Sequence, residues 1–196
     1  MDKRSRRIAL VAGILGVMLM VTVLGVGFYG LVVGWKQETK PGDEGRVVTV
    51  EDFATFFELN LKPEGDGLQF YRTGYIDDSY SIDYEYTAPD ESFFVSSTLM
   101  HEPESGDAKT AYAGATLSMG ATLSLFGEDL EIDQDEHLLD AVADDGDVRW
   151  VMAEGERIGV AAVARRDSEV LIFVQTGYGF SDDALLELLA TSTEMF

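Results

Sequence analysis

Residues 79–87 read SYSIDYEYT and carry the clearest strand pattern of the chain. Aromatic or apolar side chains alternate with polar ones, and a period of two places the two kinds on opposite faces of a strand. One face receives Tyr80, Ile82, Tyr84 and Tyr86, and the other receives Ser81, Asp83 and Glu85. The pattern therefore predicts a β-strand with two unlike faces.

One further strand is expected on each side of this one. Residues 68–75 precede it across a turn at Asp77 and Asp78, and residues 92–100 follow it after a turn over residues 88–91. Because short turns connect neighbouring strands as hairpins, we expect the three strands to pair in an antiparallel sheet.

Helices are predicted before and after this group of strands. A helix over residues 51–61 follows Thr49, whose spacing to Asp52 is that of a capping box. A second helix over residues 107–126 has apolar or small residues at every third or fourth position. Ser181 is a suitable N-cap for a final helix.

The C-terminal half contains three more predicted strands, over residues 147–153, 157–165 and 169–176. The last is apolar on both faces, which is typical of a central strand covered on both sides. The order of elements is then helix, three strands, helix, three strands, helix. It predicts an α+β domain in which helices pack on a mostly antiparallel sheet of about six strands.

The N-terminal forty residues predict a membrane anchor. Residues 8–33 read IALVAGILGVMLMVTVLGVGFYGLVV, a run of 26 residues without a charge. As a helix this run is about 39 Å long, enough to cross a hydrocarbon core of ~30 Å. Four basic residues lie within residues 1–7, so the positive-inside rule predicts a cytoplasmic tail and a domain outside the cytoplasmic membrane. The polar residues 34–46 are expected to form a flexible linker to a domain over residues 47–196.

Three alternatives to an uncleaved transmembrane anchor exist for the apolar run. A cleaved signal peptide has a shorter apolar region and a small-residue cleavage site, and Val33-Gly34-Trp35 is a poor one. Ser5-Arg6-Arg7 hints at a twin-arginine export signal, although paired arginines are common in basic flanks. A buried helix of a soluble protein is disfavoured by the length of the run.

Glycines at the end of the run favour close helix pairing. Gly30 and Gly34 have the small-xxx-small spacing that lets two membrane helices approach each other. We therefore expect the partner to be another envelope protein, or a second copy that associates through this helix. The run contains no ionisable residue, which argues against a proton or ion pathway.

Charge is distributed unevenly along the chain. Residues 1–40 hold six Lys or Arg and two Asp or Glu, whereas residues 41–196 hold eight and 34. The two parts therefore carry net charges of +4 and −26, within a formal −22 for all 196 residues. An acidic body repels polyphosphate, so nucleic acid is not an expected partner. The chain has no Cys, which excludes disulfides and thiolate metal sites.

One segment offers candidate metal ligands. Glu131, Asp133, Asp135 and His137 alternate, so in an extended segment all four face one way and can hold a divalent cation. The alternative is an acidic loop, or the first turn of a helix near Asp133. The chain has no glycine-rich phosphate-binding motif, and no cofactor is predicted.

Acidic side chains of the first strand group are candidates for general acid–base chemistry. Asp77, Asp78, Asp83 and Glu85 can supply the paired carboxylates of a glycoside hydrolase. In a chain with 36 acidic residues such pairs also arise by chance, so the alternative is a solvated turn and strand face.

These observations predict a single-pass membrane protein whose extracytoplasmic domain is a non-catalytic accessory or protein-interaction module. The alternative is a membrane-anchored extracytoplasmic hydrolase that uses acidic residues, with or without a divalent cation. A pocket that gathers two carboxylates of raised pKa favours the hydrolase. An exposed apolar patch on the sheet favours the interaction module.

Overall fold

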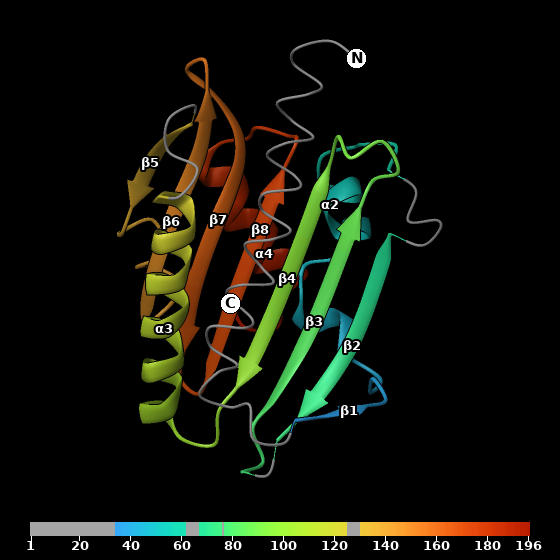
Figure 1. The fold of residues 1–196 in the computed structure, drawn as a ribbon, viewed down its shortest axis with the longest axis vertical. Coiled ribbons are helices and arrows are strands. Elements are labelled where there is room, and N and C mark those ends of the chain that lie inside the picture. The colour runs from blue at the N-terminus through green and yellow to red at the C-terminus, as the bar shows by residue number, and fades with distance from the viewer. Residues whose placement is uncertain (1–33, 62–66, 76, 125–129) are drawn as a thin grey trace.

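Eight antiparallel strands form one sheet in the computed structural model, which describes residues 34–61, 67–75, 77–124 and 130–196. The strand order is β1-β2-β3-β4-β8-β7-β6-β5, so two four-stranded meanders meet where β4 pairs with β8 (Figure 1). The strands of the first meander are β1 (Trp35–Gln37), β2 (Leu68–Gly74), β3 (Tyr80–Thr87) and β4 (Phe94–His101). The strands of the second are β5 (Glu131–Asp135), β6 (Asp145–Ala153), β7 (Glu156–Arg166) and β8 (Glu169–Thr176).

Helices cover the two faces of this sheet unequally. The α-helices of the described residues are α2 (Val50–Phe56), α3 (Ser105–Ser124) and α4 (Asp182–Ser192), and a 3-10 turn η1 spans Glu44–Arg46. In Figure 1, α3 lies on the near face over the second meander, whereas α2 and α4 lie behind the sheet. The prediction of an α+β domain with helices on an antiparallel sheet is therefore confirmed.

Two apolar cores result from this arrangement. Behind the sheet, Phe53 of α2 and Leu185 and Leu188 of α4 are fully buried against strands of both meanders. In front, α3 packs Ala115 and Met119 onto the second meander. The strand residues of this front core include Val163, Val170, Ile172 and Val174.

The strongest sequence patterns are found where they were expected. Ile82, Tyr84 and Tyr86 of β3 all face the rear core. On β8, Ile172 faces the front core and Phe173 the rear core, which confirms a central strand covered on both sides. The capping box of α2 is also present, because Thr49 Oγ1 accepts a hydrogen bond from Asp52 N at 3.1 Å and Asp52 Oδ2 accepts one from Thr49 N at 2.9 Å.

The sheet has eight strands, so the expected number of about six is wrong. The additional strands are the short edge strands β1 and β5, which lie within the predicted linker and within the acidic segment that carries the candidate metal ligands. An edge strand pairs through its backbone on one side only and needs little apolar alternation, which is why neither segment shows the apolar pattern of a strand. The first helix is also shorter than residues 51–61, since it ends at Phe56 and Glu58 adopts a left-handed φ of 53°.

The predicted flexible linker over residues 34–46 is likewise part of the fold. Trp35, Lys36 and Gln37 pair with Gly74, Thr73 and Arg72 of β2. Further along, Asp43 is buried and bonded to Arg72. Residues 35–46 therefore belong to the folded domain, which the sequence placed only from Val47 onwards.

No helix of the described residues is long and apolar enough to cross a membrane. The predicted span over residues 8–33 and its basic flank lie outside those residues, and so does Gly30. Gly34 is described, and a Cβ atom there would lie 2.8 Å from the Tyr75 ring. This close approach is a reason for glycine at residue 34 that does not depend on helix pairing.

Candidate functional site

The predicted metal ligands line the outer strand of the second meander. Glu131, Asp133 and Asp135 occupy alternate positions of β5, as expected for an extended segment. His137 follows the strand, and its Nδ1 lies 3.0 Å from Asp140 Oδ2. Within the described residues, no three His, Asp or Glu side chains are close enough together to hold a metal ion. The described residues therefore do not bring the four predicted ligands together, and the metal site stays a prediction.

The four acidic residues of the first strand group separate into two kinds. Asp77 stabilises the β2–β3 turn, since its Oδ1 accepts hydrogen bonds from Ser79 N at 3.1 Å and Ser79 Oγ at 2.6 Å. Asp78 lies in the same turn with a left-handed φ of 68°. Asp83 and Glu85 instead share one face of β3, opposite the face that packs on the rear core.

Asp83 is the most unusual carboxylate of this face, because its exposed fraction is only 7%. Its Oδ2 accepts a hydrogen bond from Ser81 Oγ at 2.7 Å, and its Oδ1 accepts one from Thr98 Oγ1 at 3.0 Å. Burial raises the pKa of Asp83, and the two hydroxyl donors only partly oppose this effect. Burial also raises the pKa of Glu85.

A row of polar side chains crosses the first meander at this position. Tyr71, Asp83 and Thr98 are directly paired across β2, β3 and β4. Burial and the negative charges of Asp83 and Glu85 raise the pKa of Tyr71 to about 12. We refer to this surface of β2, β3 and β4 as the polar face; its members are Gln69, Tyr71, Thr73, Ser81, Asp83, Glu85, Ser96 and Thr98.

The outer edge of β2 is the second unusual feature of the first meander. Gly67 O accepts a hydrogen bond from Thr87 N, and Tyr75 N donates to Ser79 O, so odd-numbered residues of this strand bond to β3. In an antiparallel ladder successive residues point their backbone groups to opposite sides. The even-numbered residues therefore point outwards: Arg72 and Gly74 meet β1, whereas Leu68 and Phe70 lie beyond the end of β1.

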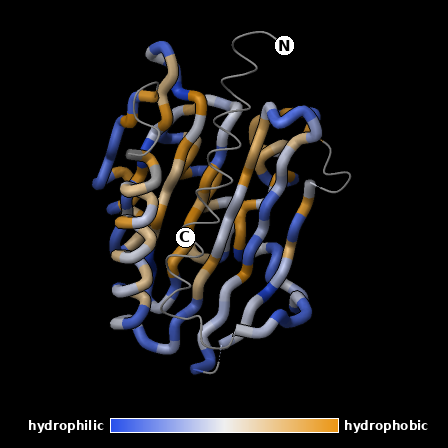
Figure 2. Tube along the Cα trace, viewed as in Figure 1, coloured by the Kyte–Doolittle hydropathy of each residue, from blue (hydrophilic) through white to orange (hydrophobic). Residues whose placement is uncertain are grey.

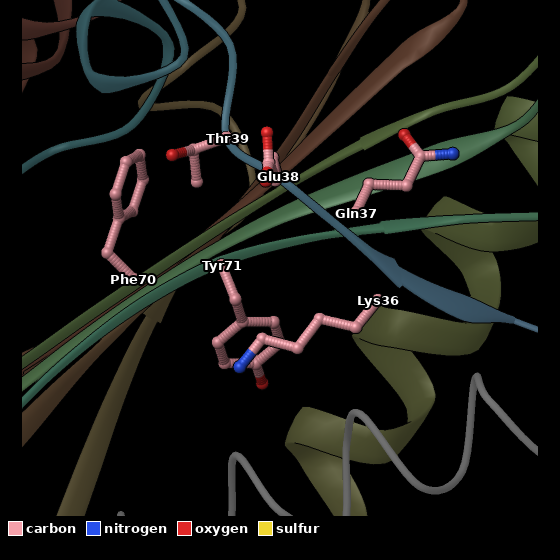
Figure 3. Close-up of a pocket in the computed structure, with 6 residues that line it drawn as sticks. All are labelled: Lys36, Gln37, Glu38, Thr39, Phe70 and Tyr71. Atoms are coloured by element: carbon pink, nitrogen blue, oxygen red, sulfur yellow. The ribbon is translucent and has the colours of Figure 1, made fainter.

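A groove of about 630 Å³ opens at this edge, where the chain leaves β1 and diverges from β2. Its lining residues are Lys36, Gln37, Glu38, Thr39, Phe70 and Tyr71 (Figure 3). Phe70 and Tyr71 project to opposite sides of β2, and Lys36 Nζ lies 5.6 Å from the centroid of the Tyr71 ring. The groove therefore exposes backbone, an aromatic ring and both signs of charge.

A buried ion pair holds the segment that follows the groove-lining residues 36–39. Arg72 Nη1 donates to Asp43 Oδ1 at 2.8 Å, and the guanidinium carbon of Arg72 lies 3.6 Å from the centroid of the Tyr80 ring. Arg46 donates hydrogen bonds to the Tyr80 hydroxyl and to Glu169. These contacts fix residues 43–46 against the sheet, a few residues beyond the groove-lining segment 36–39.

Sequence reasoning missed both the edge and the ion pair. The hydrogen-bonding pattern of β2 depends on where β1 stops, and Arg72 and Asp43 are 29 residues apart. The one available signal was the run of uncharged residues Leu68–Tyr71 without a strand-breaking residue. Comparison of the chain with protein-family models, curated proteins and solved structures found no match.

Proposed function

We propose that the chain is a single-pass membrane protein whose acidic α+β domain works outside the cytoplasmic membrane as a non-catalytic interaction module. The observation that carries this proposal is the uncharged run of 26 residues behind a basic flank, followed by a body of net charge −26. A basic flank favours the cytoplasmic side and an apolar run of this length favours a bilayer.

The geometry of the domain adds a second argument. β1 begins at Trp35, the second residue after the apolar run, and it is an integral edge strand of the sheet. A span over residues 8–33 would therefore hold the β1–β2 edge next to the membrane surface. Trp35 is 45% exposed, and amphipathic rings of this kind favour the membrane interface. The domain would thus present one defined edge to neighbouring envelope proteins.

The membrane orientation of the chain can be tested by cysteine labelling without background from native cysteines, because the chain has no Cys. Leu117 on α3 is 74% exposed, so Leu117→Cys provides a label site on the domain, and Ser5→Cys provides one on the basic flank. In intact cells that express the full chain, a membrane-impermeant maleimide should label Leu117→Cys only. Permeabilised cells should show labelling of both variants. Labelling of Ser5→Cys but not Leu117→Cys in intact cells would contradict the proposed orientation.

A second candidate is an extracytoplasmic hydrolase, and one observation favours it. Asp83 and Glu85 are neighbours on one strand face, and burial raises the pKa of both, as a general acid requires. The test is turnover of p-nitrophenyl glycosides by the full chain in detergent micelles, with Asp83→Asn and Glu85→Gln as variants. A hydrolase requires turnover that both variants lose by about 100-fold or more while remaining folded. Absence of turnover by the unmodified chain, or full activity of both variants, would exclude this role for the pair.

A further inference from the structure

Two residues of β2 offer backbone groups to the outside of the sheet. Leu68 and Phe70 point their N–H and C=O groups away from β3, and β1 ends before reaching them. No strand or hydrogen bond of the described residues occupies these groups. Free ladder positions of this kind are templates for an added strand.

The opposite edge of the sheet differs in chemistry. β5 carries Glu131, Asp133 and Asp135 in five residues, and charged side chains on an edge discourage strand addition. The free part of β2, Leu68–Tyr71, carries no charge, and Leu68 is 38% exposed. Of the two edges, the β2 edge is therefore the one suited to accept a strand.

We propose that the β2 edge at Leu68–Tyr71 binds an extended segment of another protein that alternates apolar and basic residues. This inference rests on the proposed function and deepens it by naming the surface and the kind of partner. The segment would lie in the groove between β2 and residues 36–39 and would continue the sheet beyond β1.

The two sides of β2 explain why the bound segment should alternate apolar and basic residues. Leu68 and Phe70 face the rear side, where Phe70 packs 6.1 Å from the Tyr84 ring, so residues opposite them meet apolar surface. Gln69 and Tyr71 face the polar face, beside Glu85 and Asp83. A long basic side chain on that side of the added strand would extend over Gln69 towards Glu85, two strand spacings (about 10 Å) away.

Charge favours a basic segment over a second copy of this chain as the occupant of the groove. The body of the chain carries −26, so a second copy would be repelled, whereas a basic segment is attracted. Glu38, which lines the groove, adds a further exposed carboxylate near the binding edge. Lys36 is the one basic residue of the groove, and it lies over the Tyr71 ring.

The test uses the full chain in detergent micelles and the probe peptide Ac-KVKVKVK-NH2. Amide hydrogen exchange, measured residue by residue by NMR, should slow about tenfold or more at Leu68 and Phe70 when the peptide is present. Two control peptides separate the causes: Ac-EVEVEVE-NH2 reverses the charge, and the lysine peptide with N-methylated valines lacks ladder donors. Neither control should slow exchange at these amides.

Matched variants test the same edge from the protein side. Leu68→Pro removes an outward donor while leaving the β2–β3 hydrogen bonds, and Leu68→Val keeps the donor. Peptide affinity should fall about tenfold or more in Leu68→Pro and stay within about twofold in Leu68→Val. If Leu68→Pro fails to fold, the N-methylated peptide still decides the question.

Four results would overturn the proposal. Three concern the peptides: equal protection by the N-methylated peptide, protection of β5 amides instead of β2 amides, and no slowing at about 1 mM peptide. Protection that depends on protein concentration without peptide would assign the edge to a second copy and also overturn it. None of these results depends on which side of a membrane the domain occupies, so a failure here is distinguishable from a failure of the labelling experiment.

Discussion

The two meanders of the sheet share a topology and differ in chemistry. Thr98 of β4 is paired with Ile172 of β8, so the row that begins Tyr71–Asp83–Thr98 continues on the other side of the β4–β8 pair as Ile172 and Val163. Hydroxyls and a carboxylate thus give way to aliphatic side chains at one strand boundary. Figure 2 shows the same contrast: hydrophobic residues, in orange, concentrate on β7 and β8, whereas β2 and β3 carry more white and blue, the colours of polar residues.

The helix α3 accounts for this difference. It follows β4 in the chain, yet it packs on the second meander and covers Val163 and Ile172 there. Among the described elements, no helix packs on the front of β2 and β3. The second meander is therefore enclosed between two apolar layers and serves stability, whereas the first is free to carry polar groups and an accessible edge.

The largest expected effect on stability comes from breaking the buried ion pair of each meander. Arg72→Met leaves the Asp43 carboxylate buried without its cation, which should lower the free energy of unfolding by about 3–5 kcal/mol. Each carboxylate keeps one hydrogen bond, Asp43 from Lys40 N at 2.7 Å and Asp147 from Gln134 Nε2 at 3.0 Å. Arg149→Met in the second meander should nevertheless cost less, because the Arg149 side chain is 14% exposed against 6% for Arg72, and Arg72 also stacks on the Tyr80 ring. Denaturant unfolding of the full chain in micelles measures both. Equal losses would remove this distinction between the meanders.

The next largest effect on stability comes from truncating front-face side chains on either side of the β4–β8 boundary. Ile172→Ala opens a cavity beneath α3 and should cost about 2–5 kcal/mol. Ser96→Ala, on the polar face, loses only a 3.2 Å hydrogen bond to the Tyr84 carbonyl and should cost about 0.5–1.5 kcal/mol. The same unfolding measurement applies. A Ser96→Ala loss as large as that of Ile172→Ala would show that the polar face is equally important for stability.

A pH dependence should distinguish the buried carboxylate of the polar face. Burial raises the folded-state pKa of Asp83 above its ordinary 3.8, so between these two values the folded chain binds more protons at this site than the unfolded chain. The contribution of Asp83 to stability therefore falls as pH rises through that window. Asp83→Asn does not titrate, so its melting temperature should gain on that of the unmodified chain as the pH rises above 3.8. A difference that stays constant with pH would refute the burial argument.

The smallest effect concerns two glycines of α3. A Cβ atom at Gly106 would have no neighbouring atom within 4 Å, so Gly106→Ala should stabilise the chain by about 0.5–1 kcal/mol through helix propensity. A Cβ at Gly120 would lie 2.5 Å from Arg149 Nη1, and that guanidinium is bound to Asp147 through its other nitrogens. Gly120→Ala should therefore gain nothing or lose up to about 1 kcal/mol. Thermal unfolding of both variants checks the pair, and equal gains would contradict it.

The parts of the fold that could be predicted from the sequence are those with local periodicity. The alternation around Tyr84, the two-sided apolar run around Phe173 and the cap at Thr49 each depend on residues a few positions apart. Such patterns report directly on which face is buried.

The candidate site depends on features that have no local pattern. Asp83 occupies a position that alternation assigns to solvent, yet it is buried and accepts hydrogen bonds from hydroxyls of its own strand and of β4. The ordering of residues 35–46 depends on Arg72, which lies on another strand. Charged and polar residues such as Asp43 are expected in a linker, and only a long-range partner shows otherwise.

The pairing of β4 with β8 has a consequence for the order in which parts of the sheet form during synthesis. Partners in this ladder are 68 to 82 residues apart, so a nascent first meander must wait, with one side of β4 unsatisfied, until β8 has emerged. Contacts between such distant residues are formed late and slowly. The waiting strand carries Ser96, Ser97 and Thr98 in succession, and this hydroxyl-rich stretch is less prone to aggregation than an aliphatic one during biosynthesis.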